Sequence, residues 1–281
     1  MKAGVNVKSM NANKVLPIVA AVFALLALWF AFSGWQVWSA NSLVKSSEEA
    51  RKKVAGQVQP LISGVAGKAG ALSSRSDIAA ALLAGNEDAA KALVMQAVPG
   101  TEAVDFAPTG FAAAYSNPET YGFGKLALLE RASQEGKPAI GVIKDGGGPR
   151  LGVAVPVLDK AQVIGVLYLR EPISELSKLA EGAAPKGSYI ALRQGSFNVF
   201  ESGDAENLRG HPEANPVQIE GTSMRVVSMT PEAEAGKFGA GGLGEFGIAV
   251  FLLLAAAGMV WWSRRPAAAF DAAPAVETAA A

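Results

Sequence analysis

Two long apolar runs, one near each end of the chain, constrain this sequence more than any other feature. Residues 15–32 contain no charged side chain, and residues 246–262 form a second such run that ends in two tryptophans. At about 1.5 Å per residue of helix, each run is close to the length that crosses a hydrocarbon layer about 30 Å thick. We therefore expect transmembrane helices at 15–33 and 246–262.

The charges beside the two runs predict their orientation. Residues 1–14 contain three lysines and no acidic residue, and Arg264 and Arg265 follow the second run directly. The positive-inside rule then puts both ends of the chain in the cytoplasm. The expected location is a bacterial inner membrane, with residues 34–245 in the periplasm and an Ala/Pro-rich cytoplasmic tail at 263–281.

A cleaved signal peptide is the alternative interpretation of the first run. Ala31-Phe32-Ser33 is a small-x-small triplet of the kind that cleavage needs. However, the apolar run is longer than the usual signal core of about 7–15 residues, which favours an uncleaved anchor. Either outcome leaves the middle region tethered by the second run.

Composition excludes several classes of function. The chain has 25 Lys+Arg against 25 Asp+Glu, so it lacks the excess positive charge of a nucleic-acid binder. It has no cysteine and one histidine, which excludes thiolate metal sites and makes a histidine-based zinc site or catalytic triad a poor fit. We predict no catalytic residue, no metal site, no cofactor and no enzymatic activity.

A glycine motif lies directly before the second apolar run. Gly239-x-Gly241-x-x-Gly244 matches the dinucleotide-binding fingerprint by letter. That fingerprint works between a strand and a soluble helix, whereas here it precedes an apolar run. We interpret 233–245 as a flexible Gly-rich linker.

Residues 34–100 are predicted to form a stalk and the helical part of the outer region. Apolar residues recur at helical spacing from Leu43 to Leu72, including Leu61, and Pro60 should kink this helix. Two short helices follow, for which Asp77 and Asn86 are the expected N-caps. The apolar face of the stalk needs a partner, and a folded domain or a second subunit in a homodimer would each supply one.

Strand patterns begin after this helical part. Residues 101–180 are expected to hold short strands at 103–106 and 111–115, a helix at 121–135 with Leu126, Leu129, Ala127 and Ala132 facing inward, and an antiparallel meander at 139–144, 151–158 and 163–170. Residues 181–232 add four strands that could form a reduced second sheet. The fold class is therefore α+β, with an antiparallel-sheet domain between two transmembrane helices.

The hairpin in the middle of this region resembles Cache domains, the PAS-like extracytoplasmic sensor domains. The segments that carry the resemblance are Pro149–Leu158, PRLGVAVPVL, and Val163–Leu169, VIGVLYL. A narrower resemblance is to the non-catalytic, membrane-anchored N-terminal extension of long bacterial phosphomannomutase/phosphoglucomutase proteins. The catalytic serine loop of those mutases does not occur in this sequence, so the resemblance does not imply their activity.

The Cache resemblance implies a ligand cavity between the meander and the segment that crosses it. Alternation along the last strand puts Val166, Tyr168 and Arg170 on one face and Leu167 and Leu169 on the other. The candidate ligand-binding residues are aromatic and basic: Tyr115, Tyr121, Arg150, Tyr168 and Arg170. Arg150 would hold a small anionic or carboxylate ligand between aromatic walls, although solvated arginines and half-buried tyrosines would give the same pattern.

These features favour a membrane-anchored sensory or regulatory domain. It would bind a small ligand and relay its state across the membrane to a cytoplasmic partner or a fused C-terminal domain. The alternative is a ligand-free anchor or assembly module for an envelope polysaccharide or sugar-phosphate enzyme.

Overall fold

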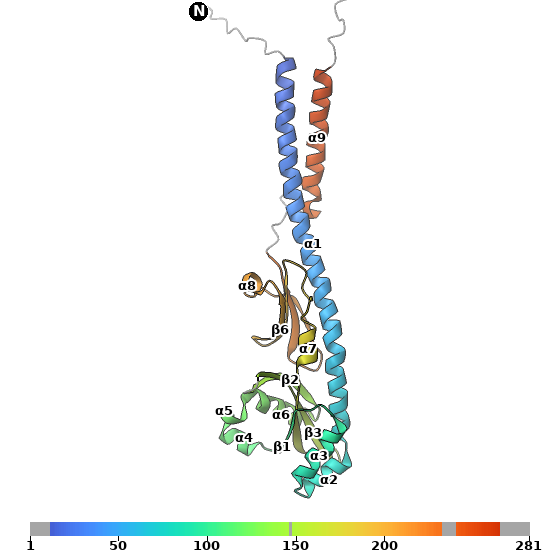
Figure 1. Ribbon diagram of the computed structural model, residues 1–281, viewed down its shortest axis with the longest axis vertical. Helices are drawn as coiled ribbons and strands as arrows, with labels where there is room; N and C mark the ends of the chain where they lie inside the picture. Colours follow the sequence, from blue (N-terminus) through green and yellow to red (C-terminus); the bar gives the residue numbers. More distant parts are fainter. Residues whose placement is uncertain (1–11, 146–147, 232–239, 265–281) are drawn as a thin grey trace, which may run out of the picture. The chain divides into compact units, whose positions relative to one another are not determined.

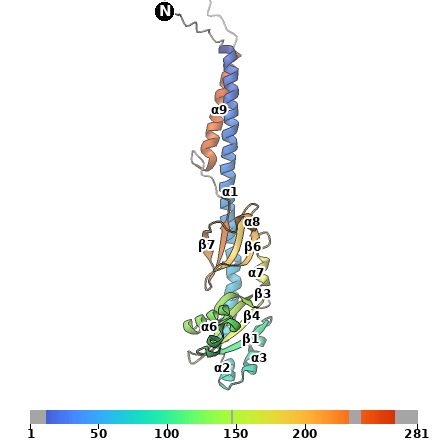
Figure 2. The ribbon, with the colours of Figure 1, turned by 90° about the vertical axis from the view of Figure 1, so that its left-hand side faces the viewer.

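The computed structural model describes residues 12–145, 148–231 and 240–264. These residues divide into two compact units, which Figures 1 and 2 show in two views. One unit runs from Leu43 to Pro231, and the other combines the described residues up to Ser42 with those from Ala240 onward. Each unit is described by itself.

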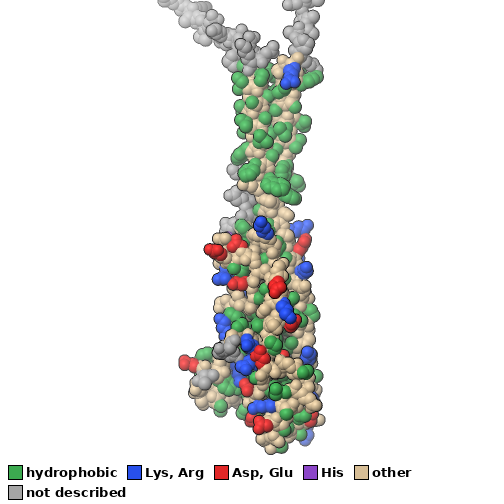
Figure 3. Space-filling model, viewed as in Figure 1, with side chains coloured by type: hydrophobic (Ala, Val, Ile, Leu, Met, Phe, Trp, Pro, Cys, Tyr) green, Lys and Arg blue, Asp and Glu red, His purple; other side chains and the backbone are tan. Residues whose placement is uncertain are grey.

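Two apolar helices make up the smaller unit. Helix α1 (Ala12–Ser73) begins there, and α9 (Leu243–Ser263) follows the short 3-10 turn η1 (Ala240–Gly242). Both helices have a stretch long and apolar enough to cross a membrane, with mean hydropathies of 2.6 and 2.1. Large apolar side chains cover the outside of this unit (Figure 3). The helices expected over the two apolar runs are confirmed, and their surface suits lipid better than water.

Two glycines bring these helices close together, which changes the interpretation of the Gly-rich segment. A Cβ atom on Gly242 would lie 2.5 Å from the carbonyl oxygen of Gly34, too close for any other residue without a shift. Gly242 also has a φ of +93°, a conformation that glycine adopts most readily. Its role in this unit is therefore close packing against α1 rather than flexibility, while Gly239 lies outside the described residues.

The larger unit contains two four-stranded antiparallel sheets. The first sheet has the order β1-β4-β3-β2 and the second has the order β6-β5-β8-β7. The strands of the first sheet are β1 (Ala103–Pro108), β2 (Ala139–Asp145), β3 (Gly148–Asp159) and β4 (Gln162–Glu171). Those of the second sheet are β5 (Tyr189–Gln194), β6 (Phe197–Gly203), β7 (Ala214–Gln218) and β8 (Met224–Met229). The predicted meander and the α+β class are confirmed.

Short helices connect and cover these sheets. They are α2 (Ser76–Leu83), α3 (Glu87–Ala97), α4 (Ala112–Ser116), α5 (Pro118–Tyr121), α6 (Phe123–Glu135), α7 (Ser174–Lys178) and α8 (Ala205–Leu208). Asn86 caps α3 as expected, with its side-chain oxygen accepting from the amide of Ala89 at 3.1 Å.

The main core lies between α1 and both sheets. Val54, Val58 and Ile62 of α1 are at most 3% exposed and belong to one apolar cluster with residues of both sheets. Helix α6 covers the other face of the first sheet, where Leu129 and Ala132 pack in a cluster that includes Tyr168. The first sheet is thus covered by helices on both faces.

Several sequence-based expectations were wrong. The segment expected as a strand at 111–115 is helix α4, and strand β1 pairs with the distant β4. In α1, Ile62 is buried while Leu61 is 37% exposed. Helix α1 includes Pro60, and the kink expected there stays a prediction. The error at 111–115 arises because short Ala-rich or apolar segments fit helix and strand patterns equally well.

Two smaller expectations also fail. Asp77 lies inside the first turn of α2 rather than at its N-cap, which is Arg75. Ala127 of α6 is exposed and Leu128 is buried in its place. Both shifts are by one or two residues, the usual uncertainty of helix ends and faces.

Candidate ligand-binding site

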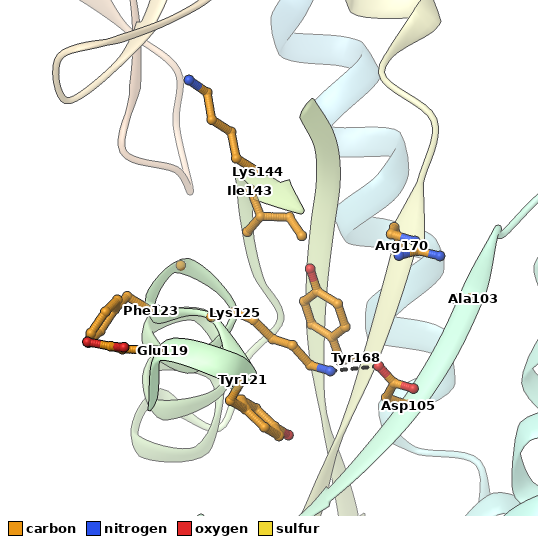
Figure 4. Close-up of a pocket in the computed structure, with 12 residues that line it drawn as sticks. Ala103, Asp105, Glu119, Tyr121, Phe123, Lys125, Ile143, Lys144, Tyr168 and Arg170 are labelled. Carbon is orange, nitrogen blue, oxygen red and sulfur yellow. Dashed lines mark hydrogen bonds and ion pairs between the residues drawn. The ribbon is translucent and has the colours of Figure 1, made fainter. Parts of the chain in front are cut away.

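A hollow of about 550 Å³ opens on the face of the first sheet that α6 covers, opposite α1 (Figure 4). Its size falls in the range of about 300–1,000 Å³ typical of small-molecule sites. Strands β1, β2 and β4 and the α5–α6 segment contribute its walls. The side chains that line it are mostly charged or aromatic: Asp105, Glu119, Tyr121, Phe123, Lys125, Ile143, Lys144, Tyr168 and Arg170, with Ala103, Gly122 and Gly124.

Strand alternation positions the floor of this hollow. Tyr168 and Arg170 project to this face of β4, whereas Leu167 and Leu169 project into the core shared with α1. Asp105 of β1 lies directly opposite Tyr168 in the antiparallel ladder. Cross-strand neighbours have Cβ atoms about 5 Å apart, so this register brings the carboxylate beside the tyrosine ring.

A glycine on the neighbouring strand makes room for that ring. Gly152 of β3 is next to Tyr168, and a Cβ atom there would lie 2.7 Å from the tyrosine hydroxyl oxygen. Tyr168 is only 3% exposed as a result of this packing. The absence of a side chain at Gly152 therefore makes space for the Tyr168 ring.

Lys125 occupies the centre of the hollow. Its Nζ lies 2.6 Å from Oδ2 of Asp105 and 4.7 Å from the ring centroids of both Tyr121 and Tyr168. Figure 4 shows the lysine reaching from α6 to Asp105, with the two rings beside it. A lysine in the first turn of a helix is unfavourable for the helix dipole, so the contact with Asp105 offsets a local cost. The Lys125 side chain is 18% exposed.

The remaining charges lie at the edge of the hollow. Arg170 Nε is 3.6 Å from Glu102 Oε2, and the same carboxylate oxygen is 2.7 Å from Arg150 Nε. Lys144 points away from Lys125, with its Nζ 4.2 Å from the ring centroid of Phe197 in the second sheet. Burial, followed by the negative charge of Asp105, raises the pKa of Tyr121, so this phenol stays neutral at physiological pH.

The structure brings together some of the predicted site residues and separates others. Tyr121, Tyr168 and Arg170 line the hollow. Arg150 is not among the lining residues, and its Nε donates to Oε2 of Glu102 at 2.7 Å. Tyr115 is 55% exposed on α4 and hydrogen-bonds Glu130 of α6, so the helical fold of this segment removes it from the wall. The ligand contacts of all five residues stay predictions.

Sequence reasoning missed the two residues at the centre, Asp105 and Lys125. Asp105 belongs to a segment correctly predicted as a strand, but its neighbour in β4 is more than sixty residues away in sequence. For Lys125 a signal was present, because a lysine in the first turn of a predicted helix opposes the helix dipole and calls for a nearby acid. No such signal identifies which acid.

Comparison with known sequences gives no relative. No protein-family model matches the sequence, and no curated protein matches it.

Comparison with solved structures gives several similar chains. The sensor domain of the V. cholerae histidine kinase DctB aligns with a TM-score of 0.50 and 11% identity, over 70% of this chain and 100% of that one. The sensory domain of the Campylobacter jejuni chemoreceptor Tlp3, solved with isoleucine bound, gives 0.44 and 12%, over 72% and 97%. The ligand-binding domain of the Pseudomonas aeruginosa chemoreceptor PctC, in complex with GABA, gives 0.43 and 15%, over 69% and 100%.

The DctB alignment bears on the fold alone. It supports the expectation that a Cache-like sensor-domain fold lies between the two apolar helices. The narrower resemblance to phosphomannomutase extensions finds no counterpart among these structures.

Proposed function

We propose that this protein is a membrane-anchored sensor whose periplasmic Cache-like domain binds a small ligand in the hollow around Lys125. The observation that carries the proposal is the hollow itself, where acidic, basic and aromatic side chains from strands β1, β2 and β4 and from helices α5 and α6 converge. The sensor-domain fold and the two apolar helices support the same conclusion. Both termini are proposed to be cytoplasmic on the distribution of lysine and arginine.

The lining indicates the general chemistry of the ligand. The lining includes two lysines, an arginine and two carboxylates, of which Lys125 and Asp105 face each other, and the aromatic rings add an apolar wall. Such a surface favours a small polar molecule with a charged group over a wholly apolar one. Because Arg170 lines the hollow and Arg150 does not, we expect Arg170 to contact a carboxylate of the ligand.

A thermal-shift screen tests this proposal. Full-length protein in detergent or nanodiscs is heated with individual amino acids, organic acids and sugars, since a ligand that binds only the native state raises the melting temperature. We expect one compound class to raise it in the wild type and to have a much smaller effect on Arg170→Gln. No shift across the screen, or an equal shift in the variant, would contradict binding at this hollow.

The relay of ligand state is the second part of the proposal. The ligand-bound domain would act through its membrane helices on a cytoplasmic partner or a fused C-terminal domain. A homodimer formed through the stalk and the transmembrane helices is the assembly we propose for this relay. In-membrane cysteine crosslinking along α1, with and without a ligand from the screen, tests both ideas.

One observation favours the alternative of a ligand-free anchor or assembly module for an envelope polysaccharide or sugar-phosphate enzyme. The most central polar groups of the hollow, Lys125 and Asp105, already pair with each other. A hollow satisfied by its own side chains needs no ligand. The same screen separates the two functions, because an anchor predicts no shift with any compound.

A further inference from the structure

Three side chains of the hollow form a cage around an ammonium group. The Asp105 carboxylate and the rings of Tyr121 and Tyr168 surround a single point, and the Nζ of Lys125 occupies that point. The distances are 2.6 Å to the carboxylate oxygen and 4.7 Å to each ring centroid. A cation within about 6 Å of an aromatic centroid is attracted by the ring, and partial desolvation strengthens the attraction.

The walls of this cage do not depend on the lysine for their positions. Asp105 and Tyr168 sit on adjacent strands in fixed register, and Gly152 seats the Tyr168 ring. Tyr121 ends α5, directly before the Gly122 turn that begins α6. Removing the lysine side chain would therefore leave a preformed acidic and aromatic site of ammonium size, connected to the rest of the hollow.

We infer that Lys125 is a built-in occupant of an ammonium-binding subsite, and that an amine-bearing ligand binds by displacing it. This inference rests on the proposed function of the hollow and names the ligand class, a small organic molecule with a primary ammonium group. Because the lysine is attached to the chain, its effective concentration at the cage is about millimolar or higher. A ligand must therefore add contacts elsewhere in the hollow, so that simple amines are rejected.

Lys125 also differs from the other lysine of the hollow. Lys144 lies against Phe197 and points out of the cage, so it shares the charge of Lys125 without its position. Variants of the two lysines therefore separate occupation of the cage from a general change in charge.

The test uses n-butylammonium chloride, whose four-carbon chain and ammonium group copy the lysine side chain. It is titrated by calorimetry into full-length protein in detergent, with sodium chloride keeping the ionic strength constant. We expect Lys125→Ala to bind the amine at least tenfold more tightly than the wild type, and to recover melting temperature as the amine is added. The matched variant Lys144→Ala should bind it as weakly as the wild type.

A double variant checks the chemistry of the cage. Adding Asp105→Asn to Lys125→Ala should weaken amine binding at least tenfold. If Lys125→Ala does not fold, Lys125→Ser serves in its place, with circular dichroism as the check on folding. Equal amine affinity in the wild type and the lysine variant, or no measurable binding to the folded variant, would overturn the inference.

The two proposals fail in different ways. If the ligand screen finds nothing for the wild type but Lys125→Ala binds n-butylammonium, the cage exists and the sensing function is wrong. If the screen finds a ligand but the lysine variant ignores the amine, the sensing function holds and this inference is wrong.

Discussion

The side chain of Gln194, at the end of β5 in the second sheet, pairs with both backbone polar groups of Val142 in the first. Its Oε1 accepts from the Val142 amide at 2.7 Å, and its Nε2 donates to the Val142 carbonyl oxygen at 2.8 Å. Val142 lies in β2, the edge strand whose next two residues, Ile143 and Lys144, line the hollow. The wall of the hollow is thereby attached to the second sheet.

Replacing Gln194 tests how much this attachment contributes. We expect Gln194→Ala to lower the free energy of unfolding by about 1–3 kcal/mol, because two backbone groups of the edge strand lose their partners. Hydrogen exchange at Val142 should become faster in the variant. Gln218→Ala, at the exposed end of β7, is the matched control and should change neither quantity. Unchanged exchange at Val142 in the first variant would show that the pairing is dispensable.

Gly165 of the hairpin motif is expected to be intolerant of any side chain. A Cβ atom there would lie 2.3 Å from Cε2 of the Phe106 ring and 3.1 Å from the carbonyl oxygen of Ala107. Gly165→Ala should therefore cost about 1–3 kcal/mol of stability through overpacking. The double variant Gly165→Ala/Phe106→Leu should recover part of the lost stability. Gly210→Ala is the control, because a Cβ atom there meets open space, and it should leave stability nearly unchanged. Denaturant unfolding measures all three, and an equal loss in both single glycine variants would refute the packing argument.

Glu213, directly before β7, pairs with two arginines of the second sheet, and its ionisation should be visible in stability at low pH. Arg225 Nε lies 2.8 Å from Oε2 of Glu213, and Arg193 Nη1 lies 2.8 Å from its Oε1. These two guanidinium groups lower the pKa of Glu213 to about 2. A carboxyl with a lowered pKa contributes stability above its unfolded value, near 4.5, and loses it as the pH falls towards 2.

The corresponding variant is Glu213→Gln. At pH 7 we expect it to be less stable than the wild type by about 2–3 kcal/mol, and the difference should shrink between pH 4.5 and pH 2. Glu206→Gln, which changes an exposed carboxylate, controls for the loss of one negative charge. A difference that stays constant with pH, measured by denaturant unfolding, would contradict this assignment.

The contact between Gly34 and Gly242 can be followed by fluorescence, because all five tryptophans lie in α1 and α9. Gly242→Ala should separate the two helices and lower the detergent-denaturation midpoint seen in tryptophan emission, since the new Cβ would meet Gly34 at 2.5 Å. Gly247→Ala, in the same helix with open space around the added atom, should leave the midpoint unchanged or raise it. A normal midpoint for Gly242→Ala would argue against close packing of these helices.

The sequence was sufficient for features that depend on local pattern. The two apolar runs, the three-strand meander and the two faces of β4 all follow from residue spacing that the structure repeats. The alternation along β4 placed Tyr168 and Arg170 on the correct face because a strand leaves no other choice once its register is set.

Features that depend on contacts between distant segments could not be predicted in this way. Nothing near Asp105 indicates that it meets Lys125, because that contact needs the β1–β4 pairing and the turn at Gly122 together. Residue spacing gives Arg150 and Arg170 equal standing as candidates, because it does not indicate that Arg150 pairs with Glu102 just before the first strand. The roles of Gly152 and Gly165 likewise depend on aromatic rings from neighbouring strands.

Hydrogen–deuterium exchange on full-length protein in nanodiscs tests the central claim, that a small ligand binds in the hollow, most directly. The experiment compares the protein alone with the protein at a saturating concentration of the most stabilising compound from the screen. We predict slower exchange in segments 103–108, 119–126 and 165–171, which form the floor and rim of the hollow. Unchanged exchange in all three segments, with protection elsewhere or nowhere, would contradict the claim.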